Sequence, residues 1–312
     1  MIKAFITFIA LASLLLICSQ SAPTEQQTGK GAQSVPMQGN LREQIEKISP
    51  AAQGKVGASV MLLETNESVS FNGDQKFPMQ SVYKFPIGMC VLNQVDKGAL
   101  KLDEKVRIRK SDLVPPKAGS PIRDKYPRGV ELSVRELLRY MMIESDGTAS
   151  DVLLHLVGGA DRVNAYLHDL GVTEIVVATT EAEMTTGEDV QYRNWAQPDA
   201  AVGLLRAFYE GRGLSAESRT LLLQLMTNST TGPHRLKGGL PAGTVVAHKT
   251  GTSGTVEGLT RATNDIGIIT LPDGRHLIIA VFVSDSKAQA AAREGVIARI
   301  ARAAYDWATA MH

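Results

Sequence analysis

The chain opens with one continuous apolar segment. Lys3 precedes a run of apolar residues from Ala4 to Ile17, and a polar stretch rich in Gln, Ser and Gly follows. A basic residue before a short apolar run is typical of a signal peptide, and this run is too short to span a bilayer comfortably. We therefore expect a signal peptide over residues 1–21 and a polar linker over residues 22–40.

Apolar residues follow two different spacings after the linker, one helical and one typical of strands. Residues 41–48, LREQIEKI, carry apolar side chains at helical spacing and predict a short amphipathic helix. Residues 54–64 and 67–73 are rich in apolar and β-branched side chains and predict two strands joined by the polar pair Thr65–Asn66.

Helical patterns fill the middle of the chain. In residues 132–144, Ser133 and Glu136 are spaced as a capping box at a helix start. The stretch SDGTAS interrupts the helical pattern, which resumes at Asp151. Residues 179–198 have no clear period and predict a long irregular loop, which inside a compact domain is often functional.

Alternating patterns return near the C-terminus. Residues 244–252 predict a strand, and residues 265–283 predict a hairpin that turns at Pro272–Gly274. A final helix is expected from about Lys287 to Ala310. Strands at both ends of a helical middle predict the α+β class, with an antiparallel sheet flanked by helices and an inserted all-helical domain.

The same order suggests how the chain is divided. We expect one large domain over residues 41–312. Within it, residues 41–78 and 228–312 would form a sheet subdomain, and residues 79–227 a helical subdomain.

The composition and charge of the chain bear on which binding partners are expected. The 312 residues are 44% hydrophobic, which is ordinary for a globular protein, and the formal net charge is only +1. No long basic run or basic–aromatic stripe is present, so we expect no nucleic-acid partner. The six histidines have no metal-ligand spacing, so we expect no metal and no cofactor. Nothing implies a protein partner, and we expect a monomer.

Two cysteines bear on the compartment. An exported chain whose only cysteine beyond the leader is Cys90 has no internal disulfide, and Cys90 sits in an apolar run typical of a core. Cys18 offers lipid attachment as a second arrangement, although Ile17 is bulky for the residue before a lipidated cysteine. We expect an exported, periplasmic protein and leave open whether it is free or lipid-anchored.

The chemistry rests on a serine and a lysine three residues apart. Ser81 and Lys84 lie at the start of a helical pattern, one turn apart on the same face. Serine is a poor nucleophile unless a neighbour takes its proton, and Lys84 is within reach to do so. Ser284 and Lys287 have the same spacing, so the pair alone does not decide.

Only the first pair is followed by further motifs. Ser145–Gly147 reads S-D-G, and Lys249–Thr252 reads K-T-G-T. The order S-x-x-K, S-D-x, K-T-G resembles class A serine β-lactamases and penicillin-binding proteins. The stretches VVAHKTGTSG and ATNDIGIITLPDG are similar to the PER-like, extended-spectrum branch of class A. The resemblance spans about Leu41 to Met311.

The resemblance implies a fold and a catalytic domain. The family fold is a three-layer α/β/α sandwich of the β-lactamase/transpeptidase type, with the site between its sheet and helical parts. Residues 41–312 would form the catalytic domain. The substrate would be a small β-lactam, a penicillin or a cephalosporin, including extended-spectrum substrates.

It also implies roles for particular residues. Ser81 would attack the lactam carbonyl, Lys84 would accept its proton, and Ser145 would pass a proton to the leaving nitrogen. The backbone N–H groups of Ser81 and Thr252 would stabilise the oxyanion. The substrate-binding residues implied are these: Gly147, Arg235, Lys249, Thr250, Gly251, Thr252 and Ser253.

Two of these binding positions depart from the usual family residues. Gly147 replaces an Asn that normally holds the acylamide of the substrate. The strand arginine of many members is absent near Asp265, and Arg235 is a candidate to supply that charge. A plain surface arginine is the alternative interpretation of Arg235.

A glutamate on the long loop would distinguish a hydrolase from a protein that forms the acyl-enzyme but releases it slowly. By the register of the family loop, Glu181 would activate the deacylating water; the alternative for Glu181, and for the nearby Glu183, is a solvated loop carboxylate. Thr179 and Thr185 replace the Arg and Asn that usually tie this loop. Ala182 replaces a Pro, and Asp151 stands where most members have Asn. We therefore expect a differently folded and roomier loop that admits bulky cephalosporins.

Other functions stay open on the sequence alone. A DD-peptidase of the penicillin-binding type shares Ser81 and Lys84 but does not need Glu181. A β-lactam sensor domain would need a membrane anchor and a partner domain, neither of which this sequence shows. A generic serine esterase is a further alternative, although no G-x-S-x-G surrounds Ser81.

Overall fold

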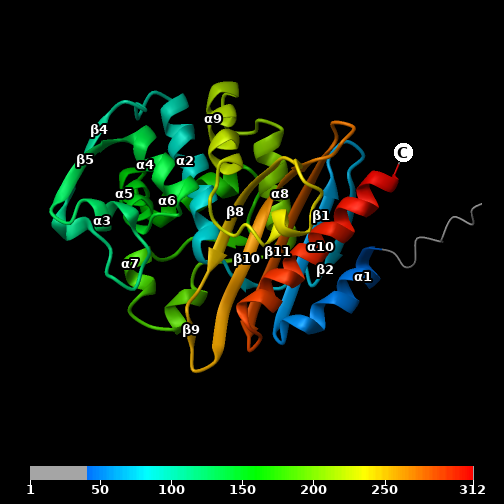
Figure 1. The fold of residues 1–312 in the computed structure, drawn as a ribbon. Helices are drawn as coiled ribbons and strands as arrows, with labels where there is room; N and C mark the ends of the chain where they lie inside the picture. The colour runs from blue at the N-terminus through cyan, green and yellow to red at the C-terminus, as the bar shows by residue number, and fades with distance from the viewer. Residues whose placement is uncertain (1–40, 312) are drawn as a thin grey trace, which may run out of the picture. The chain divides into compact units, whose positions relative to one another are not determined.

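The computed structural model describes residues 41–311 (Figure 1). The expected signal peptide, the linker and Cys18 lie outside the described residues. No helix within 41–311 combines the length and the apolar character needed to cross a membrane.

Strands from both ends of this range form the larger sheet. The strand order is β2-β1-β11-β10-β8, with β9 paired to β10, and every neighbouring pair is antiparallel. The strands are β1 (Lys55–Leu62), β2 (Glu67–Phe71), β8 (Val246–Thr252), β9 (Thr255–Val256), β10 (Leu259–Thr270) and β11 (His276–Ser286). Because β1 pairs with β11, the N-terminal hairpin and the C-terminal hairpin join in one sheet, as the sequence predicts.

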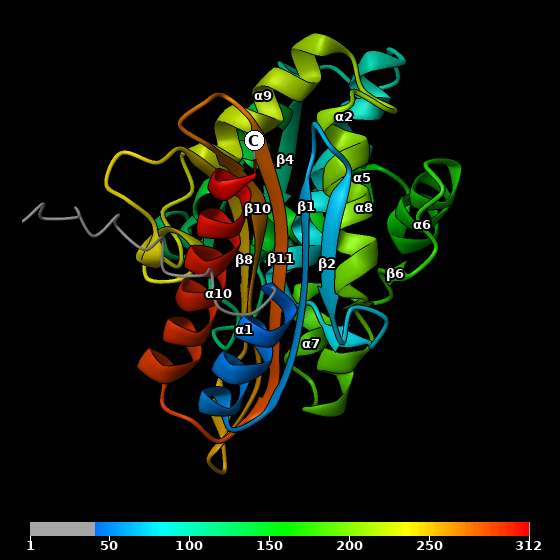
Figure 2. The same ribbon diagram turned by 90° about the vertical axis from the view of Figure 1, so that its right-hand side faces the viewer.

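Two helices cover one face of this sheet. α1 (Leu41–Ile48) and α10 (Ala290–Ala310) lie side by side on that face in Figure 2. Alternate residues of β1 point towards them, so Val60 packs in one core with Ile45 and Ile297. This alternation is what a strand with one face towards each core requires.

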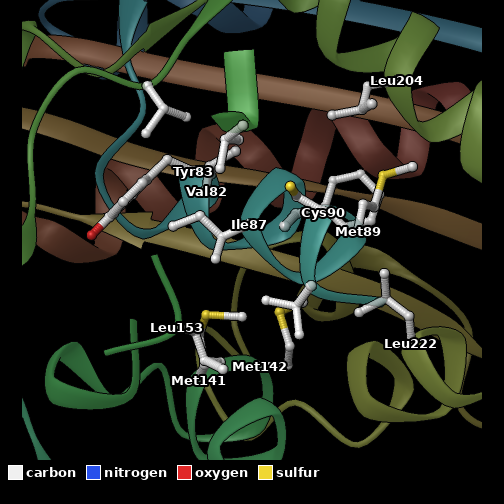
Figure 3. Packing of buried hydrophobic residues seen from close by; sticks show 14 of the residues in the cluster. Val82, Tyr83, Ile87, Met89, Cys90, Met141, Met142, Leu153, Leu204 and Leu222 are labelled. Atoms are coloured by element: carbon white, nitrogen blue, oxygen red, sulfur yellow. The ribbon is translucent and has the colours of Figure 1, made fainter. Parts of the chain in front are cut away.

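The helical segment packs on the opposite face. Its centre is α2 (Lys84–Asp96), which is buried on nearly every side; Figure 3 shows Ile87, Met89 and Cys90 among side chains from neighbouring helices. Cys90 is a core residue, as expected. The other helices are α3 (Pro121–Lys125), α4 (Val134–Ile143), α5 (Gly147–Leu156), α6 (Gly159–Asp169), α7 (Glu181–Met184), α8 (Pro198–Tyr209) and α9 (Ala216–Thr227).

The inserted segment is not purely helical, which corrects one expectation. β4 (Lys105–Arg109) pairs with β5 (Gly129–Ser133) in one small sheet. The short strands β6 (Ile175–Val176) and β7 (Trp195–Ala196) form a second small sheet with β3 (Phe77–Pro78), which lies just before the inserted segment. β4, KVRIR, and β5, GVELS, do alternate apolar and polar residues, a short strand signal that the expectation of an all-helical segment overlooks. The two-residue strands β3, β6 and β7 are too short to give such a signal.

One helix begins earlier than the sequence pattern indicates. α5 begins at Gly147 rather than at Asp151, and the side chain of Asp146 caps it by accepting a hydrogen bond from Ala149 N. Thr148 and Ser150 in this first turn are fully buried polar residues held by tertiary hydrogen bonds. Buried polar residues do not contribute to a hydrophobic pattern. The prediction that SDGTAS interrupts the helix is therefore wrong for Gly147–Ser150.

Candidate active site

The predicted motif residues gather around one cleft of about 530 Å³. It is lined by the turn before α2, the turn between α4 and α5, the start of α7 and the end of β8. The lining includes these predicted residues: Ser81, Lys84, Ser145, Glu181, Thr250, Thr252 and Ser253. Ser284, the serine of the second S-x-x-K match, instead lies within β11 opposite Lys55 and Ala262.

Ser81 sits on a 3₁₀ turn, Gln80–Tyr83, that leads into α2. The residue before it, Gln80, has φ of +47°, and Ser145 across the cleft has φ of +57°. Left-handed backbone is uncommon for residues other than glycine, and such strain collects at functional sites. Gly251 allows β8 to approach this turn, since a Cβ there would lie 2.2 Å from Met79 O.

Three side chains meet at the entrance to α2. The Lys84 Nζ lies 2.8 Å from Glu181 Oε1, and the Ser81 hydroxyl donates to the same oxygen over 3.3 Å. Lys84 Nζ also donates to the backbone oxygen of Ser145 over 2.6 Å. Lys84 is almost fully buried, so its interactions are with protein groups and with whatever enters the cleft.

Lys249 reaches the same point from the sheet. Its Nζ donates to Ser145 Oγ over 2.9 Å and to the Thr250 carbonyl oxygen over 3.0 Å. Burial, and then the charge of Lys84, hold the pKa of Lys249 well below its usual range. The serine of S-D-G is therefore held between the lysine of S-x-x-K and the lysine of K-T-G.

Asp151 holds the backbone that carries Glu181. One carboxylate oxygen accepts from Glu181 N over 2.7 Å and the other accepts from Ala182 N over 3.0 Å. Its two oxygens give each N–H group a separate acceptor, whereas an amide side chain would have a single oxygen to share between them. Burial raises the pKa of Asp151 to about 6, although these two hydrogen bonds act in the opposite direction.

Glu183 has a different task from Glu181. Thr180 caps α7, and Glu183 completes a capping box by accepting from Thr180 N over 2.9 Å. It also accepts from the hydroxyl of Thr179 over 2.9 Å. The backbone hydrogen bond from Thr180 lowers the pKa of Glu183. Of the two glutamates, only Glu181 contacts Ser81 and Lys84.

Asn194 ties the start of the loop to its end. The amide oxygen of the buried Asn194 accepts from Ala178 N over 2.7 Å and from Thr179 N over 3.0 Å. Its amide nitrogen donates to Thr179 O over 2.9 Å. Thr179, Asn194 and Asp151 therefore hold this loop; whether it is roomier than the usual family loop stays a prediction.

Arg235 lies behind the end of β8 and is not a surface arginine. It is 5% exposed; its Nη2 donates to Thr252 Oγ1 over 2.7 Å, and its Nη1 to the carbonyl oxygens of Gly251 and Asn264 over 3.2 and 3.0 Å. Its Nε pairs with Glu294 over 3.1 Å. The surface alternative is thus wrong, and the guanidinium lies next to the K-T-G-T strand.

Close neighbours constrain two further predicted binding residues, Gly147 and Ser253. A Cβ added to Gly147 would lie 3.1 Å from Gly119 O and 3.4 Å from the Cβ of Glu181, so a larger residue there needs the neighbours to move. The hydroxyl of Ser253 accepts from Ala262 N over 3.0 Å, which fixes it against β10.

The motifs do not reveal every residue of the cleft. The Thr231 hydroxyl lies 2.6 Å from that of Thr250, and Gln80 donates to Gln191 over 2.8 Å; both Thr231 and Gln191 line the cleft. They lie on polar loops with no motif spacing, so the sequence gives no signal for them. Within residues 41–311, no group of three or more acidic, histidine or cysteine side chains is placed to hold a metal ion.

A sequence profile of the Beta-lactamase enzyme family matches residues 40–308. The chain belongs to this family. It is an enzyme, and its activity is β-lactam hydrolysis.

Named relatives place this β-lactamase more closely. It is 42% identical to the extended-spectrum β-lactamase PER-1 of Pseudomonas aeruginosa over 98% of this chain and 95% of that one. It is 40% identical to β-lactamase VEB-1 of the same species over 86% of this chain and 90% of that one.

Solved structures agree with the fold. A β-lactamase from Chitinophaga pinensis is 49% identical with a TM-score of 0.84, covering 86% of this chain and 99% of that one. The TLA-1 extended-spectrum β-lactamase is 46% identical with a TM-score of 0.83, covering 86% and 97%. The α+β fold class and the resemblance to the PER-like branch of class A are confirmed.

Proposed function

We propose that this β-lactamase works through an acyl-enzyme on Ser81 and that water activated by Glu181 releases the product. The observation that supports this most directly is the meeting of Ser81, Lys84 and Glu181 at 2.8 and 3.3 Å. A penicillin-binding protein that only forms the acyl-enzyme does not need a carboxylate at this position.

The acylation step uses the contacts around Ser81. Its Oγ forms a bond to the lactam carbonyl carbon while its proton passes to the Lys84–Glu181 pair. The lactam C–N bond then breaks, and the nitrogen receives a proton through the Ser145 hydroxyl, which Lys84 and Lys249 both contact. The backbone N–H groups of Ser81 and Thr252 stabilise the oxyanion that forms between these steps.

Deacylation reverses the roles of these groups. Glu181 removes a proton from a water molecule, whose oxygen bonds to the ester carbonyl carbon. Ser81 leaves with a proton returned by the Lys84–Glu181 pair, and free enzyme is restored. The two N–H contacts of Asp151 hold Glu181 where this is possible.

The sheet side of the cleft binds the substrate carboxylate. Lys249 and Arg235 supply positive charge, and the hydroxyls of Thr250, Thr252 and Ser253 supply hydrogen bonds. The contact between Arg235 and Thr252 supports this role, because it places the guanidinium directly behind the cleft wall. Gly251 lets this wall lie against the Ser81 turn, and Gly147 leaves space near Glu181.

The substrates include cephalosporins with bulky side chains as well as penicillins. PER-1 and TLA-1 carry the description extended-spectrum, and the unusual ties of the Glu181 loop support the same range here. The enzyme is an exported, periplasmic monomer with a catalytic domain over residues 41–312. Its sheet subdomain comprises 41–78 and 228–312, and its helical subdomain 79–227.

The test mixes purified protein with a cephalosporin and follows lactam absorbance together with intact protein mass. We expect continuing loss of absorbance with only a transient mass gain on Ser81. Glu181→Ala should retain the acyl form and slow its release by at least about 100-fold, the typical contribution of a positioned base. Glu183→Gln is the matched control and should keep turning over.

A different result would contradict this proposal. A single burst of absorbance loss with a persistent mass gain in the wild-type protein would contradict the role of Glu181 and indicate a penicillin-binding type of reaction.

A further inference from the structure

A buried acid–imidazole pair lies directly behind the K-T-G-T strand. His248 precedes Lys249 on β8, and Asp265 lies on the neighbouring strand β10; both side chains are fully buried. The Nδ1 of His248 lies 3.0 and 2.9 Å from the two carboxylate oxygens of Asp265. The mechanism above uses neither residue.

The pair faces the sheet layer opposite the reacting groups. Successive side chains alternate along β8, so His248 points to the same face as Val246, in the core with α1 and α10. Lys249 points the other way, towards Ser145. Gly267 makes room for the imidazole, since a Cβ there would lie 2.9 Å from His248 Cβ. The arrangement therefore needs three residues on two strands.

Asp265 also reaches the segment that carries Arg235. Its Oδ2 accepts from Leu236 N over 3.2 Å, and the guanidinium of the preceding Arg235 contacts Thr252. One buried carboxylate is thus bound to the strand of Lys249 through His248 and to the loop of Arg235 through Leu236. The segments that carry the two cationic residues of the proposed carboxylate-binding wall therefore both contact Asp265.

The charge of Asp265 bears on the same wall. The charged groups that act on Lys249 are Lys84 on α2, Glu181 on α7, Asp265 on β10 and Arg235 on the loop before Leu236. Three of these five groups are cations, and Asp265 lies on the side away from the substrate. Its negative charge favours the charged form of Lys249 without occupying the substrate's place. Asp265 also faces Lys237, in the same loop as Arg235.

Only one nitrogen of His248 takes part. A carboxylate accepts hydrogen bonds, so Nδ1 is the donor in this contact. Within residues 41–311, the buried Nε2 of His248 has no hydrogen-bond partner. The imidazole therefore acts on Asp265 through Nδ1 alone.

We propose that Asp265 is a positioning residue and buried counter-charge for the carboxylate-binding wall of Lys249 and Arg235, and that His248 orients it through Nδ1. The inference rests on the proposed function, because it assumes that this wall holds the substrate carboxylate. It assigns to a residue outside the cleft part of the preference for anionic β-lactams.

The test compares wild type and Asp265→Asn with one cephalosporin and its carboxylate ester. For the free acid, we expect KM to rise about tenfold in the variant, with kcat changed much less, because a charge-assisted contact is weakened. For the ester, KM should be the same in both proteins. The alkaline limb of kcat/KM for the acid should move to lower pH, because Lys249 loses its proton more readily without Asp265.

A second pair of variants keeps the test decisive if Asp265→Asn folds poorly. His248→Asn retains a donor near the Nδ1 position, whereas His248→Gln moves it towards the Nε2 position. The KM for the acid should stay near the wild-type value in the first variant and rise in the second, at similar melting temperatures.

The outcomes separate this inference from the proposed function. An equal change of KM for acid and ester, or equal behaviour of the two His248 variants, would overturn it. Failure of the wild-type enzyme to turn over the free acid would instead contradict the proposed function.

Discussion

Two properties of Asp151 act on its pKa in opposite directions. It accepts two backbone N–H bonds, which favour its charged form, and yet burial raises its pKa to about 6. Burial therefore outweighs the hydrogen bonds. The buried carboxylate nevertheless gives each of the two N–H groups at Glu181 and Ala182 its own acceptor oxygen.

This conflict predicts a pH-dependent stability. An acid whose pKa is higher in the folded than in the unfolded chain stabilises the fold at low pH, and that contribution is lost as pH rises through the folded pKa. Relative to Asp151→Asn, the wild-type free energy of unfolding should therefore fall by roughly 3 kcal/mol between about pH 4 and pH 7. Urea unfolding at several pH values measures this difference.

The control for Asp151 is an exposed carboxylate on a neighbouring helix. Asp161 lies at the surface in α6, so Asp161→Asn should leave the pH dependence of the unfolding free energy close to that of wild type. A flat difference between wild type and Asp151→Asn across this range would contradict the raised pKa.

Two helices of this enzyme begin with the same capping box. In α4, Ser133 accepts from Glu136 N over 3.2 Å and Glu136 accepts from Ser133 N over 2.7 Å. In α7, Thr180 and Glu183 make the corresponding pair of contacts. The first box starts a helix of the core, and the second starts the turn that carries Glu181.

The same motif should have different consequences in the two places. Ser133→Ala and Thr180→Ala should each lower the free energy of unfolding by about 1 kcal/mol, because each removes one helix cap. Only Thr180→Ala should also slow deacylation, since it loosens the backbone of Glu181. Chemical denaturation and the decay of acyl-enzyme mass measure the two effects; equal deacylation in both variants would show that the cap does not position Glu181.

Elements were predictable from the sequence where their signals are local. The Ser133–Glu136 capping box can be predicted because its two partners are three residues apart. The S-x-x-K, S-D-G and K-T-G motifs can also be recognised because each lies within a few consecutive residues. The start of α5 is not, because Thr148 and Ser150 are buried only through contacts with distant residues. Asn194 and the His248–Asp265 pair likewise depend on partners that only the fold brings together.

At the scale of the whole molecule, the surface predicts a monomer. Among residues 41–311, the only large hydrophobic side chains that are exposed are Val245 and Val256, and Val256 lines the cleft. No apolar patch of the size that marks a stable interface is formed by two separate side chains. Sedimentation equilibrium should therefore give the mass of a single chain across micromolar concentrations, and a dimer there would contradict this.

The pairing of β1 with β11 also means that part of the sheet cannot form until late in synthesis. β1 and β2 are synthesised early, but the outer edge of β1 gains its partner only when β11 has been made. At roughly 5–20 residues per second, that wait lasts on the order of ten seconds or more. Throughout it, a nascent chain carries an unsatisfied strand edge beside apolar residues such as Val60, and an edge of that kind invites pairing with other chains. The chain is therefore exposed to aggregation during the interval between the synthesis of these two strands.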